Sequence, residues 1–219
     1  MPYKFSSSSL GLLDECPRCF WLHFNRGIKR PSGISPSLLT GMNMILRAHF
    51  DSYRDKKELP PELGHLKDVK LFDNLEVLSV WRNHLKGIQW TDDNQNIITG
   101  TVGDLLQKGN KLIILDFQAV GFPLKEDTAD AYQDQLDIYN FLLRKYGYET
   151  EDYSYLLFYQ PNKITGKGNV LFHAELVKMP VSIENAERII KQAFEVLNGP
   201  MPAPSENCDY CKYGSAYIK

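Results

Sequence analysis

All four cysteines of the chain occur in two C-x-x-C pairs, with Cys16 and Cys19 near the start and Cys208 and Cys211 near the end. Pairs with this spacing, in a chain that shows no secretory signal, are metal ligands more often than disulfide partners. Four thiolates suit a tetrahedral Zn²⁺ or an iron-sulfur cluster, and free thiols are the alternative. One shared centre would close a loop of nearly the whole chain, so we expect the two ends to meet.

A second constraint is the stretch from Gly100 to Gly121, in which two apolar runs flank the turn-forming residues 108–110. A tight turn between runs rich in Val, Ile and Leu predicts a β-hairpin, because the connection is too short for a helix. Each strand carries one acid, Asp104 in the first and Asp116 in the second. Two carboxylates on paired strands suit a hard divalent ion such as Mg²⁺ or Mn²⁺, and the alternative is that they face solvent or a lysine.

Length and composition are those of an ordinary globular domain. The 219 residues suit a single domain over residues 1–219, with 43% hydrophobic and 24% charged residues. No apolar run approaches the roughly 18 residues that span a bilayer, and the first residues lack the apolar core of a secretory signal. We therefore expect a cytoplasmic location and no membrane partner. The formal net charge of −2 excludes a chain that is basic throughout, but it permits a local basic groove.

A helix is predicted to begin at Ser35 and Pro36, an N-cap followed by proline at the first helical position. Apolar residues recur at helical spacing as far as Tyr53, and His49 lies on the same stripe. We therefore expect His49 to point inward. A lone inward histidine is more often a satisfied core residue than a ligand, unless an acid pair lies opposite it.

A second helix is predicted to run to about Tyr146, with Asp127 or Thr128 as its cap. Its apolar stripe contains one polar residue, Gln135, and Tyr139 follows four residues later on the same face. A buried glutamine needs hydrogen-bond partners. Gln135 is therefore expected either to brace a site or to bond to the backbone of the sheet.

The other elements are predicted from caps, turns and periodicity. The segment 57–96 is interrupted by Pro and Gly and is interpreted as a helical insertion with one helix over residues 75–84. A proline-rich tether follows the last predicted helix and leads to the final cysteine pair. We further expect a helix over residues 6–16, strands over 97–106, 153–160 and 169–178, and a helix over 182–197.

Basic and aromatic residues alternate after the first cysteine pair. Such a mixture can bind phosphates and stack on nucleic-acid bases. The alternative is that the aromatic residues belong to the core while the cations are merely solvated. The cations of this segment are Arg18, Arg26, Lys29 and Arg30, and the aromatic residues are Phe20, Trp21 and Phe24.

Together these features resemble a known family, and the resemblance covers about residues 6–214. In order and spacing they are similar to the PD-(D/E)XK nucleases of the RecB and AddB type, a group that includes the four-cysteine nucleases of CRISPR adaptation. The residues that carry the resemblance are Cys16 and Pro17, the helix residue His49, the G-x-x-x-D motif from Gly100 to Asp104, the acid strand over residues 114–117, the Q-x-x-x-Y motif formed by Gln135 and Tyr139, and the C-terminal cysteines at 208 and 211.

The resemblance implies an α/β fold with a restriction-endonuclease-like core, a central mixed sheet flanked by helices, and termini joined by the cysteines of segments 6–34 and 200–214. It also implies metal-assisted hydrolysis of DNA, on single strands or free ends, by exo- or endonuclease action. The implied pathways are repair, recombination or CRISPR-type processing, in which the chain would have protein partners. The implied ligands of Mg²⁺ or Mn²⁺ are His49, Asp104, Asp116 and the Phe117 carbonyl, supported by Gln135 and Tyr139. The cysteines would hold a 4Fe-4S cluster, with Zn²⁺ as the alternative.

Two positions depart from the family pattern. Gln118 stands where the family usually has lysine, and an amide can hydrogen-bond the attacking water but supplies no positive charge. Lys125 lies just beyond the strand and is the candidate substitute. In the cysteines, Tyr217 occupies the usual position of the last ligand, so Cys19 is expected to replace it. The alternative function is therefore a catalytically weak or inactive nucleic-acid-binding protein.

Overall fold

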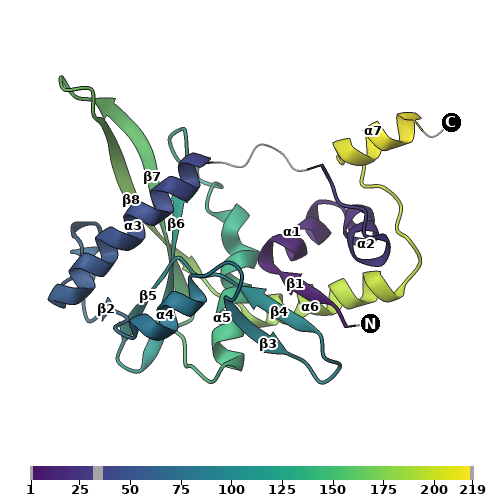
Figure 1. Ribbon diagram of the computed structural model, residues 1–219, viewed down its shortest axis with the longest axis horizontal. Helices are drawn as coiled ribbons and strands as arrows, with labels where there is room; N and C mark the ends of the chain where they lie inside the picture. Colours follow the sequence, from purple (N-terminus) through teal and green to yellow (C-terminus); the bar gives the residue numbers. More distant parts are fainter. Residues whose placement is uncertain (1, 32–36, 218–219) are drawn as a thin grey trace.

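The computed structural model describes residues 2–31 and 37–217, except for the side chains of residues 37–39 and 215–217. Two mixed β-sheets are flanked by helices (Figure 1). The smaller sheet has the order β1-β4-β3, in which β1 and β4 run parallel. The larger sheet has the order β2-β5-β6-β7-β8, in which β6 and β7 run parallel and the other neighbours antiparallel. The predicted mixed α/β architecture is confirmed at this level.

The bounds of the elements follow the chain order. The helix start expected at Ser35 and Pro36 lies outside the described residues. The strands are β1 (Lys4–Ser6), β2 (Lys70–Leu71), β3 (Ile88–Thr91), β4 (Ile97–Gly100), β5 (Asp104–Lys108), β6 (Lys111–Ala119), β7 (Tyr153–Ile164) and β8 (Val170–Pro180). The helices are α1 (Ser7–Glu15), α2 (Pro17–Arg26), α3 (Ser37–Lys56), α4 (Leu75–Trp81), α5 (Gln133–Lys145), α6 (Ile183–Asn198) and α7 (Asp209–Tyr217), with short 3₁₀ turns η1 (Pro61–Leu63) and η2 (Asp130–Tyr132).

The predicted hairpin is formed by β5 and β6. Its register pairs Lys108 with Lys111 next to the turn and Asp104 with Leu115 at the far end. Gly109 has a φ of +57° in this turn, a conformation that glycine adopts without steric cost. The hairpin forms the middle of the larger sheet, so its strands are buried on both faces.

The strand expected over residues 97–106 is divided between the two sheets, and this prediction was wrong. Residues Ile97–Gly100 form β4 of the smaller sheet, and β5 of the larger sheet begins only at Asp104. The chain changes sheets where it passes under α5. A Cβ on Gly100 would lie 2.6 Å from a ring carbon of Tyr139, so only glycine allows the backbone to approach this closely. The break therefore follows from helix packing that strand periodicity does not reveal.

The two faces of β6 belong to two different hydrophobic clusters. Leu112 and Ile114 pack with residues of α1, α5 and α6, whereas Leu115 and Phe117 pack with residues of α3. The ring of Phe117 lies 4.8 Å from that of Phe50 on α3, measured between centroids. Helices therefore cover both faces of the larger sheet, as the resemblance implied for a central sheet.

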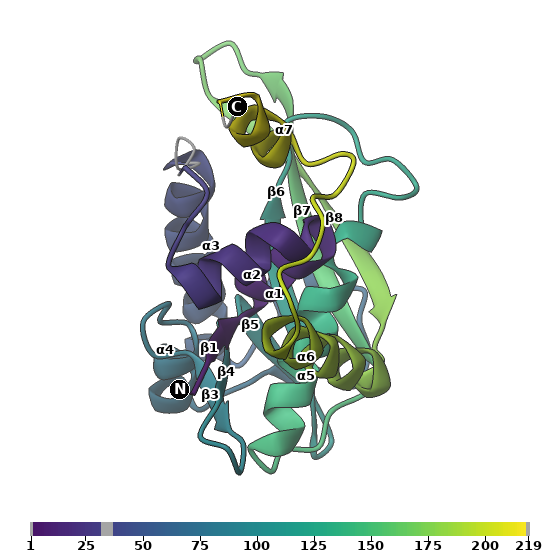
Figure 2. The ribbon, with the colours of Figure 1, turned by 90° about the vertical axis from the view of Figure 1, so that its right-hand side faces the viewer.

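The first and last parts of the chain lie on the same side of the molecule, which faces the viewer in Figure 2. α1 begins at a capping box between Ser6 and Ser9, as its sequence predicted. α2 is fixed to the end of α6 by two hydrogen bonds. Trp21 Nε1 donates to the Gly199 carbonyl at 3.1 Å, and Asn25 Nδ2 donates to the Leu197 carbonyl at 3.0 Å.

Other boundaries differ from the sequence predictions. Segment 57–96 is only partly helical, because its strands β2 and β3 pair with β5 and β4 and so belong to the two sheets. α5 begins at Gln133 rather than at Asp127 or Thr128, after the 3₁₀ turn η2. The Ser182 cap of α6 is confirmed, since its hydroxyl accepts from the Asn185 amide at 3.0 Å. Within the described chain, no helix is both long and apolar enough to cross a membrane.

Candidate metal centre and carboxylate sites

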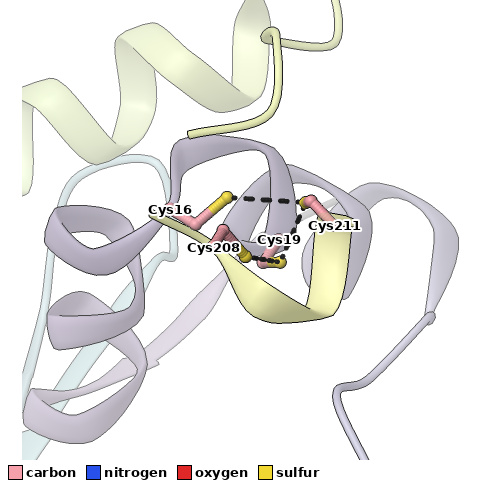
Figure 3. Close-up of side chains that lie close together, drawn as sticks. All are labelled: Cys16, Cys19, Cys208 and Cys211. Carbon is pink, nitrogen blue, oxygen red and sulfur yellow. Dashed lines mark hydrogen bonds between the residues drawn. The ribbon is translucent and has the colours of Figure 1, made fainter. Parts of the chain in front are cut away.

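The four cysteines meet where the N-terminal and C-terminal segments touch (Figure 3). Cys16 caps α2 and Cys19 lies in its first turn, while Cys208 directly precedes α7 and Cys211 lies within it. The Sγ atoms of Cys16 and Cys211 are 3.8 Å apart, those of Cys19 and Cys208 3.6 Å, and those of Cys19 and Cys211 3.7 Å. The predicted meeting of the four thiols is confirmed, including the participation of Cys19.

These separations fit a four-thiolate metal site. Zn–S bonds of about 2.3 Å in a tetrahedron place the sulfur atoms about 3.8 Å apart. All four Sγ atoms lie within 4.8 Å of one another. An iron-sulfur cluster is larger than a single ion, so it would require the same ligands to move apart. The residues therefore fit a metal centre of either kind, and the present spacing matches one zinc ion.

The surroundings favour a thiolate at Cys16, whereas burial raises the pKa of the Cys19 and Cys211 thiols. Burial raises the pKa of the Cys16 thiol, but hydrogen bonds from the backbone of Ser205 and Cys19 outweigh it and lower the value to about 6. Arg30 Nη2 donates to Cys208 Sγ at 3.6 Å and brings a positive charge to the cluster. This cation offsets part of the negative charge that a metal and four thiolates carry together.

Asp104 is completely buried and is bound by two arginines. Arg54 Nη2 donates to its Oδ1 at 2.5 Å, and Arg82 Nη2 donates to its Oδ2 at 2.6 Å. Both arginines also pair with Asp51 on α3, Arg82 through two bonds of 2.9 Å each. Two cations and two carboxylates thus form a closed cluster with no net charge. Each Asp104 oxygen already accepts from a charged donor, which leaves little capacity for a metal ion.

Asp116 lies on the opposite face of the sheet. Asp104 is paired with Leu115 and shares its face, which α3 covers, whereas the neighbouring Asp116 points toward α5. The Asp116 carboxylate accepts from Gln118 Nε2 at 2.7 Å and from Gln135 Nε2 at 2.8 Å. Asp116 and Gln118 thus lie on one face of the sheet, and Gln135 braces this acid rather than the sheet backbone.

Asp116 carries a perturbed pKa. Burial raises the pKa of its carboxyl to about 6, although hydrogen bonds from Gln118 and from the backbone of Gly103 and Phe117 act in the opposite direction. Tyr139 lies near this carboxylate, and its own pKa is raised by burial and by the charge of Asp116. The hydroxyl of Tyr139 accepts from Ser7 Oγ at 3.4 Å. The Q-x-x-x-Y pair is thus assembled around Asp116.

His49 does not join the two aspartates. It is one third exposed, and its Nε2 lies 3.2 Å from a carboxylate oxygen of Glu62, which also accepts from the hydroxyl of Tyr159 at 3.0 Å. The expectation that His49 points inward is met in part, because a third of its side chain is exposed while its ring contacts those of Phe50 and Tyr53. Among the described residues, no group of three or more possible ligands other than the cysteines gathers around one point. The predicted Mg²⁺ or Mn²⁺ site of His49, Asp104, Asp116 and Phe117 is therefore not assembled in this structure.

The predicted basic residues near the cysteines are only partly gathered. Arg18, Lys29 and Arg30 line a cavity of about 950 Å³ together with the exposed ring of Tyr210. The guanidinium carbon of Arg30 lies 4.6 Å from the centroid of that ring. Arg26 instead lies over Trp21, at 5.7 Å, outside this lining. We call the cavity with its three cations and Tyr210 the cysteine-side groove.

The aromatic residues of the same segment serve the core. Phe20 is completely buried, and Phe24 packs against the same cluster. The alternative that these rings are structural is therefore the correct one. Lys125 is exposed in the loop after β6, where its backbone amide donates to Thr128 Oγ1 at 2.9 Å. No described contact brings its ammonium group to Asp116.

Sequence reasoning missed the charged residues that surround Asp104. Arg47, Asp51 and Arg54 occur at positions i, i+4 and i+7 of α3, so they share one side of that helix. They lie directly beside the apolar residues Leu46 and Phe50. Alternating charges along the edge of an apolar stripe were the signal that could have predicted partners for a buried acid.

No family model and no curated protein sequence matches this chain. Among solved structures the chain is similar to that reported as the crystal structure of SSO0001, at 14% sequence identity and a TM-score of 0.46. The superposition covers 98% of this chain and 85% of the other.

Proposed function

We propose that this chain is a nucleic-acid-binding protein with a PD-(D/E)XK-like, restriction-endonuclease-like core whose hydrolytic site is weak or inactive. The observation that carries the proposal is the double arginine contact of Asp104. This acid stands at the position of a family metal ligand, yet each of its oxygens accepts a charge-assisted bond. A divalent ion would have to displace two buried guanidinium groups to reach it.

Two further contacts support loss of hydrolysis. The side-chain amide of Gln118 carries no charge, and its nitrogen donates to Asp116. His49 pairs with Glu62 at a separate place on α3. A metal that activates the attacking water needs several ligands, and among the described residues no group of three possible ligands gathers around Asp116.

The cysteine-side groove supports nucleic-acid binding. Arg18 and Lys29 provide phosphate contacts and the exposed ring of Tyr210 provides a stacking surface, which is the combination that single-stranded binding sites use, while Arg30 already pairs with Glu15 and Cys208. The cysteine centre supports the wall of this groove, since Cys19 and Cys211 also line it. The proposed cofactor of the chain is accordingly the four-thiolate centre, with zinc or an iron-sulfur cluster.

The test is binding and cleavage of labelled single-stranded and duplex DNA, measured in EDTA and in Mn²⁺. We expect binding in EDTA, with weaker affinity for Arg18→Ala combined with Lys29→Ala, and little or no cleavage in Mn²⁺. Lys191→Ala on α6 is the matched control, because it removes an exposed cation outside the groove. Equal affinity of the groove variant and the control would refute the proposed surface.

The second candidate is a metal-dependent DNA nuclease that acts with Gln118 in place of lysine. It is favoured by the contact of Gln135 with Asp116, because this contact joins the family's helix motif to its acid strand. If the chain is such a nuclease, we expect the wild-type protein to cleave DNA in Mn²⁺. The variants Asp116→Ala and Asp104→Ala should then abolish cleavage. Gln118→Lys separates the two candidates: a large gain of cleavage indicates a degenerate site, and robust wild-type cleavage indicates a working glutamine.

A further inference from the structure

Arg47 on α3 is a half-buried cation without a partner. Its Nε is buried and has no hydrogen-bond partner, and the described residues include none that forms an ion pair with its guanidinium. Burial, followed by the charge of Arg82, lowers the pKa of Arg47, while Asp104, Asp116 and Asp51 act in the opposite direction. A desolvated guanidinium with free donors is costly unless an acceptor reaches it.

The neighbouring carboxylates are already satisfied. Asp51 and Asp104 are neutralised by Arg54 and Arg82, which form ion pairs with both. These four side chains leave no unpaired charge for Arg47. The cation therefore adds one positive charge at the edge of a cluster that is otherwise neutral.

The remaining anion near Arg47 is Asp116, which lies within its electrostatic range but does not pair with it. The Asp116 carboxylate is held instead by Gln118 and Gln135 and by the backbone of Gly103 and Phe117. Four donors fix its orientation and reduce its need for a cation. The donors of Arg47 are thus available to an acceptor that comes from outside the chain.

We propose that Arg47 binds a phosphate of the nucleic-acid backbone at the edge of this cluster, in place of the divalent metal of a related nuclease. The inference rests on the proposed function and adds the position and chemistry of one contact. A guanidinium presents parallel donors that match two phosphate oxygens, and it needs no metal to do so. The nearby Asp116 carboxylate repels the same phosphate, so its charge limits the affinity.

The test uses a labelled single-stranded oligonucleotide in EDTA, with affinity measured at several salt concentrations. We expect Arg47→Ala to weaken binding about tenfold and to reduce the salt slope by about 0.7, the contribution of one phosphate on a single strand. Arg47→Lys is expected to restore part of the affinity, and Asp116→Asn to raise it, because that variant removes the repelling charge. Lys191→Ala is the control, and circular dichroism confirms that each variant is folded.

The possible results distinguish failure of the Arg47 contact from failure of nucleic-acid binding as a whole. If wild-type protein binds the oligonucleotide but Arg47→Ala leaves affinity and salt slope unchanged, the Arg47 contact is refuted and nucleic-acid binding stands. Weaker binding of Asp116→Asn would also overturn it, because removing a charge that repels the phosphate cannot lower the affinity of the proposed contact. Titration with inorganic phosphate, followed by ³¹P NMR, is a second probe. Phosphate binding that depends on Arg47 supports the site even if no oligonucleotide binds, and absence of binding to either probe refutes it.

Discussion

At the scale of single residues, Asp104 determines how the molecule differs from a metal-dependent nuclease. A catalytic carboxylate is normally held among other acids, so replacing it relieves repulsion. Here the carboxylate is the anionic partner of two buried arginines. Its removal leaves Arg54 and Arg82 with a single shared acid, Asp51, which is partly exposed.

Asp104→Ala is therefore expected to lower the free energy of unfolding by about 3–5 kcal/mol, the usual cost of breaking a buried ion pair on one side. Urea unfolding measures this value. The control is Asp152→Ala, which breaks an exposed pair with Arg144 and should cost no more than about 1 kcal/mol. An unchanged or increased stability of Asp104→Ala would show that the arginines do not depend on this acid.

Asp116 predicts a pH dependence of stability. Its pKa is raised by burial from 3.8 to about 6, so the folded state binds a proton more tightly than the unfolded state. This group thus favours the folded state fully below pH 4, and the favourable contribution is lost as pH rises through about 6. At pH 8 the ionised carboxylate costs up to roughly 3 kcal/mol, which Asp116→Asn avoids.

The measurement is the free energy of unfolding of wild-type protein and Asp116→Asn at pH 5 and pH 8. We expect the variant to be more stable relative to wild type at pH 8 than at pH 5. The difference between the proteins isolates Asp116 from other groups that titrate in this range. A difference that does not change with pH would contradict the raised pKa.

At the scale of elements, the sequence predicted what depends on local signals. The hairpin was predictable because its turn residues and apolar runs are adjacent in the chain, and the helix caps at Ser6 and Ser182 were predictable for the same reason. The break between β4 and β5 was not, because it depends on the ring of Tyr139, which lies about 40 residues away. α2 was missed because Pro17 was interpreted as the end of a helix although it begins one.

The candidate site likewise combines features that local sequence signals predict with features that depend on distant residues. Helical spacing predicted that Gln135 needs hydrogen-bond partners but left open whether a site or the sheet backbone supplies them, and the structure gives Asp116 as the partner. The separation of Asp104 from Asp116 could not be obtained in this way, because it depends on the register between the two strands. The partner of His49 was equally hidden, since Glu62 lies in a 3₁₀ turn of segment 57–96, which was interpreted as a helical insertion.

The close approach of Gly100 to Tyr139 gives a prediction for the packing of α5 over β4. Gly100→Ala places a methyl group 2.6 Å from the ring, so we expect a loss of about 1–3 kcal/mol in thermal or urea unfolding. Gly121→Ala is the matched control, because a Cβ there meets no atom within 4 Å. Tyr139→Leu should rescue part of the loss in Gly100→Ala, and absence of rescue would show that the ring is not the cause.

At the scale of the whole molecule, the cysteine centre joins segments nearly 200 residues apart in the chain. Ligands this far apart in sequence exclude many conformations of the unfolded chain when a metal binds them. The paired spacing made this part of the fold predictable. What the spacing could not provide is the choice of metal, because thiolates bind zinc and iron-sulfur clusters alike.

Metal removal is therefore expected to destabilise the protein and to expose the tether between α6 and α7 to protease. The measurement combines metal and sulfide content, absorbance near about 400 nm for a cluster, and limited proteolysis before and after chelation. Cys208→Ser should mimic chelation, and Glu206→Ala is a control at an exposed position of the same segment that keeps all four ligands. Protein that holds neither zinc nor iron at stoichiometric levels when prepared without oxygen would contradict a metal centre.

The two hydrogen bonds between α2 and the end of α6 limit how much of the chain can detach when the metal is lost. Trp21 and Asn25 hold the N-terminal helices to residues 197 and 199, and these contacts do not involve sulfur. Loss of the metal should therefore release the chain only beyond Gly199, while the two sheets and α1 to α6 stay in place. Because Tyr210 and Cys211 line the groove and lie beyond Gly199, loss of the metal should remove one wall of the proposed binding surface without unfolding the domain.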